Sequence, residues 1–257
     1  MKFLFIVQGE GRGHFTQAIT LEEMLLRNGH EVVEVLVGKS STRTLPGFFN
    51  RSIHAPVKRF ISPNFLPTAD NKRANLTKSF AYNLLRLPKY LRSMYYINQR
   101  IRETGAEVVI NFYELLTGLT YALFRPSVPY ICVGHQYLFL HRDFEFPDKN
   151  SCQLWMLRFF TRMTALRSSK KLALSFLEME QDDMNQIVTV PPLIRQEVTA
   201  IRPEKGDYIH GYMVNSGFAD SVESFHAKHP EVPLTFFWDR SDAEEVTRID
   251  ETLSFHQ

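Results

Sequence analysis

The sequence has little cysteine and no long apolar run, and both shortages exclude classes of protein. Only two of the 257 residues are cysteines, Cys132 and Cys152, and they form neither a C-x-x-C pair nor a metal-ligand spacing. A disulfide framework is therefore excluded, and we expect a reduced, cytoplasmic chain. No apolar run approaches the ~20 residues that a membrane span needs. The apolar start at residues 3–7 is too short for the core of a signal peptide.

Several catalytic motifs are also missing. The chain has no G-x-S-x-G elbow and no G-x-x-x-x-G-K-[ST] phosphate loop, so it gives no support to a serine hydrolase or a Walker-type nucleotide site. His135, His141 and Asp143 follow one another, but their spacing matches no standard metal site. We therefore expect no metal.

Charge is present in both signs but is unevenly spread. The formal net charge is +2, yet residues 206–257 hold 3 basic and 10 acidic residues, and the rest hold 27 basic and 18 acidic ones. This split predicts two units, of which the basic one favours an anionic ligand or membrane surface. A near-neutral total without a recognition motif gives no support to nucleic-acid binding.

Short apolar runs alternate with helical patterns along most of the chain, which predicts a doubly wound, Rossmann-like parallel α/β sheet. The predicted strands are residues 2–7, 31–37, 57–61, 107–112, 128–134, 171–176, 208–215 and 233–238. The predicted helices are residues 16–28, two helices either side of Pro88 within 77–104, and then 115–124, 151–166 and 219–229. The first helix has an apolar stripe that Glu22 interrupts.

Residues 188–205 contain three prolines and are typical of an interdomain connection. We therefore expect an N-terminal Rossmann-like domain at 1–190, and a linker with an incomplete second α/β domain at 191–257. Only about fifty residues follow the connection, whereas a second domain of this kind usually needs over ~100. The sequence thus predicts only the first part of that domain.

A glycine-rich turn separates the first strand from the first helix. It reads Gly9, Glu10, Gly11, Arg12, Gly13 and His14. Glycine lets the backbone adopt positive φ and approach a ligand closely, and a helix start offers free N–H groups to an anion. Arg12 can add a charged fork and Thr16 a hydroxyl. The pattern favours a phosphate or sugar site over a tight turn without a ligand.

A dinucleotide site is the obvious rival, but its fingerprint fails twice. The sixth position of G-x-G-x-x-G is His14, and the second strand ends in Gly38, Lys39 and Ser40 where an acidic residue should bind the ribose. Glu34 lies in mid-strand, where it should not reach a ribose. An NAD(P)-dependent oxidoreductase therefore stays open only as a less favoured alternative.

Residues 9–32 (GEGRGHFTQAITLEEMLLRNGHEV) resemble the opening of GT-B glycosyltransferases. Within that group, the pattern is most similar to the N-acetylglucosaminyl transferases of peptidoglycan lipid synthesis and related UDP-sugar transferases. These proteins share a Gly-His turn and a helix that ends near R-x-G-H-E-V. The resemblance covers about 35 residues, and the order of strands and helices agrees with it to about residue 190.

This resemblance implies two Rossmann-like domains facing a cleft, the first for an acceptor and the second for a nucleotide-sugar donor. The implied reaction transfers a sugar from the donor to an acceptor hydroxyl. It needs no cofactor, since the nucleotide-sugar is a co-substrate. The donor-site glycine-rich segment and acidic residue usual in the family are absent. A non-catalytic sugar- or phosphate-binding module is therefore an open alternative. The sequence fixes neither the sugar, the acceptor, the stereochemistry nor the oligomeric state.

His14 is the predicted catalytic residue, because imidazole can take a proton near neutral pH. In inverting relatives a histidine in this region can deprotonate the acceptor. Helix capping or phosphate contact without proton transfer is the alternative. Glu114 follows the strand at 107–112 and can orient His14, or cap the next helix.

His135 and Gln136 end the strand at 128–134, on the same predicted edge, and offer hydrogen bonds to sugar hydroxyls. An ordinary loop histidine is the alternative. Residues 80–102 and 155–171 interleave aliphatic, aromatic and basic residues. Helices of this kind can lie on an anionic membrane, here its inner face. More often they pack their apolar side on the sheet, which we favour.

Overall fold

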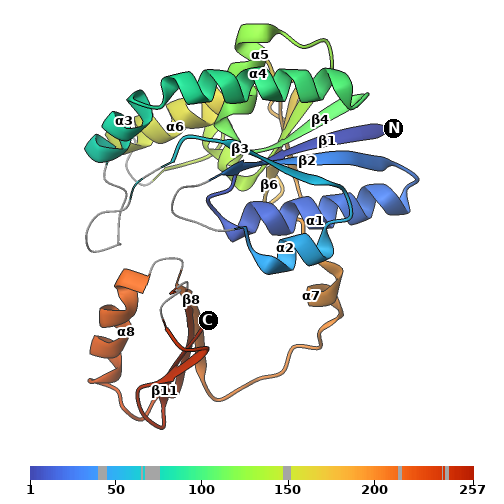
Figure 1. Cartoon of the computed structure of the whole chain (residues 1–257). Helices are drawn as coiled ribbons and strands as arrows, with labels where there is room; N and C mark the ends of the chain where they lie inside the picture. Colours follow the sequence, from blue (N-terminus) through green and yellow to red (C-terminus); the bar gives the residue numbers. More distant parts are fainter. Residues whose placement is uncertain are drawn as a thin grey trace. The chain divides into compact units, whose positions relative to one another are not determined.

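The computed structural model describes residues 1–39, 45–64, 66, 76–146, 152–213, 216–238, 240 and 243–257. The chain divides into two compact units (Figure 1). Unit 1 comprises Met1–Asn64 with Asn83–Ile201, and unit 2 comprises Phe65–Tyr82 with Arg202–Gln257. The division after Ile201 falls about ten residues beyond the expected boundary at 190.

Unit 1 is built on a seven-stranded parallel sheet of order β3-β2-β1-β4-β5-β6-β7, which confirms the predicted Rossmann-like architecture (Figure 1). Its strands are β1 (Lys2–Val7), β2 (Glu31–Lys39), β3 (Val57–Ile61), β4 (Val108–Phe112), β5 (Tyr130–Val133), β6 (Lys170–Leu174) and β7 (Ile187–Val190). The central strand β1 is apolar and buried from Phe3 to Val7 because helices cover both faces of the sheet.

The helices of unit 1 form two layers, each with its own apolar core. They are α1 (Arg12–Arg27), α2 (Gly47–Ser52), α4 (Leu87–Glu103), α5 (Leu115–Phe124), the 3₁₀ helix η1 (His135–Leu140), α6 (Cys152–Thr164) and α7 (Gln196–Ala200); α3 (Leu76–Leu84) precedes α4. One core packs α4 and α5 on the sheet, and the other packs α1 and α2 on the opposite face (Figure 1).

The order of the strands positions the site. β1 lies between β2 and β4, and β5 follows β4, with all of them parallel. Their carboxyl ends therefore meet at one edge of the sheet, where ligands of such folds gather. The glycine-rich turn follows β1, Glu114 follows β4, and His135 follows β5, so three predicted site segments share this edge.

The first helix differs from its prediction at both its start and its buried face. α1 begins at Arg12, four residues before the expected Thr16, so Gly13 and His14 lie in its first turn. Glu22, which interrupts the apolar stripe, is itself on the buried face: it is 1% exposed and accepts hydrogen bonds from the backbone N–H groups of His54 (2.9 Å) and Ala55 (2.8 Å). Glu22 is thus a buried polar residue within the apolar face, and its partners, more than thirty residues away, could not be read from the sequence pattern.

Further differences are short elements. Part of the predicted connection 188–205 forms β7 on the edge of the sheet, so that prediction was wrong for its first residues. α2 and η1 were not predicted. Pro88 does not separate the two predicted helices but lies in the first turn of α4, where its missing N–H costs nothing. Ser40 and most of the predicted loop 62–76 lie outside the described residues.

Unit 2 has a four-stranded sheet of order β10-β11-β9-β8. The strands are β8 (Ile209–Met213), β9 (Leu234–Trp238), β10 (Val246–Arg248) and β11 (Leu253–His256), with the 3₁₀ helix η2 (Ser216–Phe218) and α8 (Ala219–His226) between β8 and β9. Among these four strands, β10 runs antiparallel to its neighbour β11, and the other pairs are parallel. The two strands β10 and β11 were not predicted, and they give this unit a small core that contains Leu253 and Phe255.

Candidate functional site

His14 and Tyr113 form the centre of the sheet edge. Their rings stack with centroids 5.9 Å apart and an angle of 17° between their planes. Tyr113 follows β4 with a φ of 61°, a conformation that few side chains adopt without support. Its hydroxyl shares a hydrogen bond of 2.7 Å with Thr161 Oγ1 on α6. Two helices and the sheet therefore fix the position of the His14 ring.

His14 is 7% exposed, and its Nδ1 has no hydrogen-bond partner. Burial lowers the pKa of His14 to about 4, with a smaller contribution from the nearby His135 and an opposing one from a hydrogen bond with Gln17. The imidazole is therefore neutral at pH 7. Neutral imidazole has one ring nitrogen with a lone pair that can accept a proton. The expectation that His14 itself takes up a proton near neutral pH was wrong for this folded chain, because burial disfavours the charged ring.

Gln17 and His135 adjoin His14. Gln17 Nε2 lies 3.2 Å from His135 Nε2, within hydrogen-bond distance, and Gln17 Oε1 is buried without a partner. The structure thus brings the predicted residue His135 to the same place as His14. Gln136, which follows it, also has a buried Oε1 without a partner.

Glu114 caps α5 and lies almost entirely buried. Its Oε1 accepts hydrogen bonds from Ser62 Oγ (2.6 Å) and from the backbone N–H of Leu116 (3.1 Å), while its Oε2 has no partner. Burial raises the pKa of Glu114 to about 7, against the opposing effect of those two hydrogen bonds. The capping alternative is therefore what the structure shows. No hydrogen bond links Glu114 to His14 among the described residues, so its orienting role stays a prediction.

In the glycine-rich turn, the glycines leave room for a ligand but do not adopt positive φ angles. The positive-φ glycines of the described chain are Gly29 and Gly105, so the positive φ expected in the turn does not occur. Instead, a Cβ added at Gly13 would meet nothing within 4 Å, which leaves its backbone open to a ligand. Arg12 is exposed beside it. Thr16 Oγ1 donates to Gly13 O at 2.8 Å and steadies the helix start.

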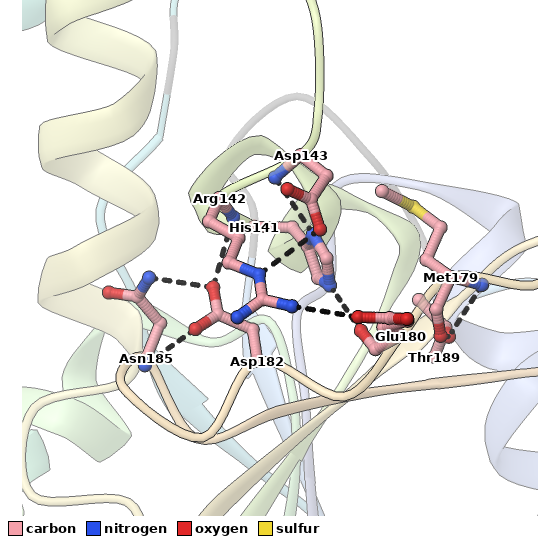
Figure 2. A network of polar contacts seen from close by, with 8 residues as sticks. All are labelled: His141, Arg142, Asp143, Met179, Glu180, Asp182, Asn185 and Thr189. Atoms are coloured by element: carbon pink, nitrogen blue, oxygen red, sulfur yellow. Dashed lines mark hydrogen bonds and ion pairs between the residues drawn. The ribbon is translucent and has the colours of Figure 1, made fainter.

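A second polar network, next to η1, has a structural role (Figure 2). His141 uses both ring nitrogens on the backbone: Nε2 lies 2.9 Å from Glu180 O, and Nδ1 accepts from the N–H of Asp143 at 3.2 Å. Asp182 accepts from the N–H of Arg142 at 2.9 Å. These bonds join the segment after η1 to the turn before β7. Within the described ranges, no three His, Cys, Asp or Glu side chains gather as a metal site.

Three residues that contribute to the site were missing from the predicted set. Gln17 lies one helical turn after His14, Tyr113 directly precedes Glu114, and Ser62 follows β3. The i, i+3 spacing of His14 and Gln17 on a helix was the available signal. Ser62 had none, because its partner Glu114 is 52 residues away.

The sequence profile of Glycosyl transferase family 1 matches residues 1–248. The chain belongs to this family. The match spans both units, and it confirms a glycosyltransferase over the oxidoreductase alternative. No curated protein sequence matches the chain. In the described part of this family member, no helix is long and apolar enough to cross a membrane.

Solved glycosyltransferases share the fold. The glycotransferase of kitacinnamycin has a TM-score of 0.58 at 14% identity, covering 99% of this chain and 70% of that one. Arabidopsis thaliana UGT89C1 with quercetin has 0.58 at 15%, covering 100% and 69%. Phytolacca americana UGT2 with UDP-2fluoro-glucose and pterostilbene has 0.55 at 12%, covering 92% and 66%. The family member described here thus has the GT-B fold and spans about two thirds of these proteins.

Proposed function

We propose that the chain transfers a sugar from a nucleotide-sugar to an acceptor hydroxyl, with His14 as the general base. The observation that carries the proposal is a set of buried polar atoms without partners at one sheet edge. They are His14 Nδ1, Gln17 Oε1 and Gln136 Oε1. Buried polar atoms in folded proteins are nearly always paired. A ligand rich in hydroxyl groups would supply the missing partners.

In this reaction the acceptor O–H gives its proton to the free ring nitrogen of neutral His14. The acceptor oxygen then forms a bond to the anomeric carbon of the donor sugar. The bond from that carbon to the diphosphate oxygen breaks, and the nucleoside diphosphate leaves with the electron pair. The stack on Tyr113 holds the base in position, and the open backbone at Gly13, with Arg12 beside it, would contact the acceptor or a phosphate.

A UDP-sugar is the donor class that we favour. UGT89C1 was solved with UDP-L-rhamnose and UGT2 with UDP-2fluoro-glucose, each a protein of similar fold at low identity. The chain spans 64% and 66% of the length of these two proteins.

The test is turnover of the His14→Ala and His14→Gln variants against a panel of nucleotide-sugars and acceptors, together with donor binding by calorimetry. We expect both variants to lose at least ~100-fold in kcat while keeping donor affinity. His229→Gln, an exposed histidine of unit 2, is the matched control. Donor binding without any turnover by the unmodified chain would instead favour the non-catalytic binding module.

We also propose that unit 1 contacts an anionic membrane surface at the cytoplasmic side through α4 and α6. The packing alternative accounts for one side of α4, where Tyr90 and Ile97 are buried. It does not account for Leu85 (84% exposed), in the turn just before α4, or for Trp155 of α6 (63% exposed). Residues 83–102 and 152–171 each hold five basic and no acidic residues. Exposed apolar side chains among cations fit anionic lipid headgroups.

Sedimentation with lipid vesicles tests this contact. We expect binding to vesicles with anionic lipid and little binding to zwitterionic ones. The Leu85→Ser, Trp155→Ser double variant should bind several-fold more weakly, whereas Val246→Ser, at an exposed position of unit 2, should not change it. Equal binding by the double variant and the unmodified chain would exclude this surface.

A further inference from the structure

Phe176 and Leu177 lie exposed in the segment that follows β6. Their exposed fractions are 88% and 75%, although both side chains are large and apolar. β6 is parallel to its neighbour β5, so this segment belongs to the carboxyl edge of the sheet, where the candidate site lies. The backbone N–H of Leu174, at the end of β6, donates to Gly134 O at 3.4 Å. Phe176 and His135 therefore follow neighbouring strands within two residues of that bond.

Hydrogen bonds hold this segment on both sides of the two apolar residues. Before them, the N–H of Ser175 donates to Val190 O of β7 at 2.9 Å, and Ser175 Oγ bonds both the N–H (2.9 Å) and the carbonyl (2.6 Å) of Leu177. After them, Thr189 Oγ1 bonds the carbonyl (2.9 Å) and the N–H (3.3 Å) of Met179 (Figure 2). The backbone thus fixes the turn that carries both apolar side chains. A surface that is ordered before its ligand arrives loses less entropy on binding.

The charges around the two side chains favour an uncharged ligand group. Residues 175–183 hold four acidic residues and no basic one. Arg142 pairs with one of them, Glu180, at 3.1 Å. An anionic lipid headgroup or a phosphate would be repelled by this segment, in contrast to the basic helices α4 and α6. Exposed apolar side chains in an acidic segment, next to a site for a hydroxyl-bearing ligand, fit the apolar part of that ligand.

The order of the strands gives the distance between this pair and the proposed base. β1, β4, β5 and β6 are consecutive neighbours, and neighbouring strands lie ~4.8 Å apart, so the ends of β1 and β6 are roughly 14 Å apart. His14 follows β1 and Phe176 follows β6. We propose that Phe176 and Leu177 are specificity-determining residues that bind an uncharged apolar group of the acceptor, about 10–15 Å from the hydroxyl that reacts at His14. This inference rests on the proposed sugar transfer at His14.

Binding of two alkyl glucosides to the whole chain, measured by calorimetry, tests the proposal. Methyl and octyl β-D-glucoside carry the same sugar, and the octyl chain adds only apolar length. A buried methylene group strengthens binding about fourfold, so we expect octyl glucoside, below its micellar concentration, to bind at least ~10-fold more tightly. The Phe176→Ser, Leu177→Ser double variant should lose most of that ratio. Met184→Ser is the matched control and should keep it, because Met184 is 92% exposed in the turn before β7, at the opposite edge of the sheet.

The methyl resonances of Leu177 in a ¹³C-labelled chain give a second readout. They should shift with octyl glucoside and not with methyl glucoside. Equal or absent binding of the two glucosides, or a ratio that the double variant keeps, would overturn the subsite. A double variant that keeps the ratio but loses binding to anionic vesicles would assign the pair to the membrane surface instead.

These measurements follow binding, so they separate the subsite from the proposed function. Turnover that depends on His14, without any preference for the octyl group, would reject the subsite alone. A preference that the double variant loses, in a chain whose turnover does not depend on His14, would uphold the apolar subsite and reject the proposed role of the base.

Discussion

The backbone of Gly38 lies directly against the carboxylate of Glu114. A Cβ at Gly38 would lie 2.5 Å from Glu114 Oε2 and 2.9 Å from Ser62 Cβ, both closer than van der Waals contact allows. Glycine is required there for space, since the φ of Gly38 is not positive. At the end of β2, where the dinucleotide fingerprint has an acidic residue, Gly38 instead leaves space for the carboxylate of Glu114, the N-cap of α5.

Gly38→Ala should therefore destabilise unit 1 by ~1–3 kcal/mol, because the added methyl group must displace a buried carboxylate and a serine. Urea unfolding measures this change. Gly13→Ala is the matched control: nothing lies within 4 Å of its Cβ, and alanine is the better helix former. We expect Gly13→Ala to keep the stability of the fold. Equal stability of the two variants would contradict the close packing at Gly38.

Glu114→Gln should change how stability depends on pH. The pKa of Glu114 is raised to about 7, so between about pH 4.5 and pH 7 the folded chain keeps a proton that the unfolded chain has lost. Stability from this group is thus present at low pH and falls as pH rises through that window. Glutamine keeps an oxygen for Ser62 and Leu116 without the charge. We expect the variant to be more stable than the parent at pH 8 by up to ~3 kcal/mol.

Urea titrations at pH 5 and pH 8 measure this difference. Glu107→Gln makes the same carboxylate-to-amide change at the exposed start of β1 and is the matched control. A parallel pH profile for Glu114→Gln and the parent would show that Glu114 is ionised in the folded chain.

The titration of His14 should make the stability of the fold depend on pH in the opposite direction. Its pKa is lowered to about 4 from an ordinary value of 6.5, so the folded chain binds fewer protons than the unfolded chain between those values. The stability contributed by the neutral imidazole is complete above pH 6.5 and is lost as pH falls toward 4. His14→Phe removes the titrating group and keeps a ring against Tyr113, so its stability should fall less between pH 7 and pH 4.5. A slope as steep as that of the parent would place the pKa of His14 near its ordinary value.

The sheet could be predicted from sequence because each buried strand is a short apolar run with polar residues on both sides, as in Lys2–Val7. β7 could not, because Ile187–Val190 directly precedes two prolines and is only partly buried. β10 is only three residues long, too short for a pattern. Within the site, His14 and His135 were found by residue type at strand ends. Gln17 and Ser62 were missed because their roles depend on partners 118 and 52 residues away.

The role of Glu22 on α1 also depends on partners far away in the sequence. Its buried carboxylate accepts from the N–H of His54 and of Ala55, and His54 Nδ1 lies 3.2 Å away. Glu22 thereby provides the hydrogen-bond acceptor for two backbone N–H groups in the segment between α2 and β3. Among the bonds described, these N–H groups have no other acceptor. Glu22→Ala leaves the buried N–H of Ala55 unpaired, at ~1–3 kcal/mol, and removes the partner of the half-buried N–H of His54. We expect a loss of ~2–4 kcal/mol in the free energy of unfolding, whereas Glu23→Ala, which removes only a surface pair with Arg27, should cost under ~1 kcal/mol. Hydrogen exchange at Ala55 should quicken in the first variant alone. Unchanged exchange there would mean that this backbone does not depend on Glu22.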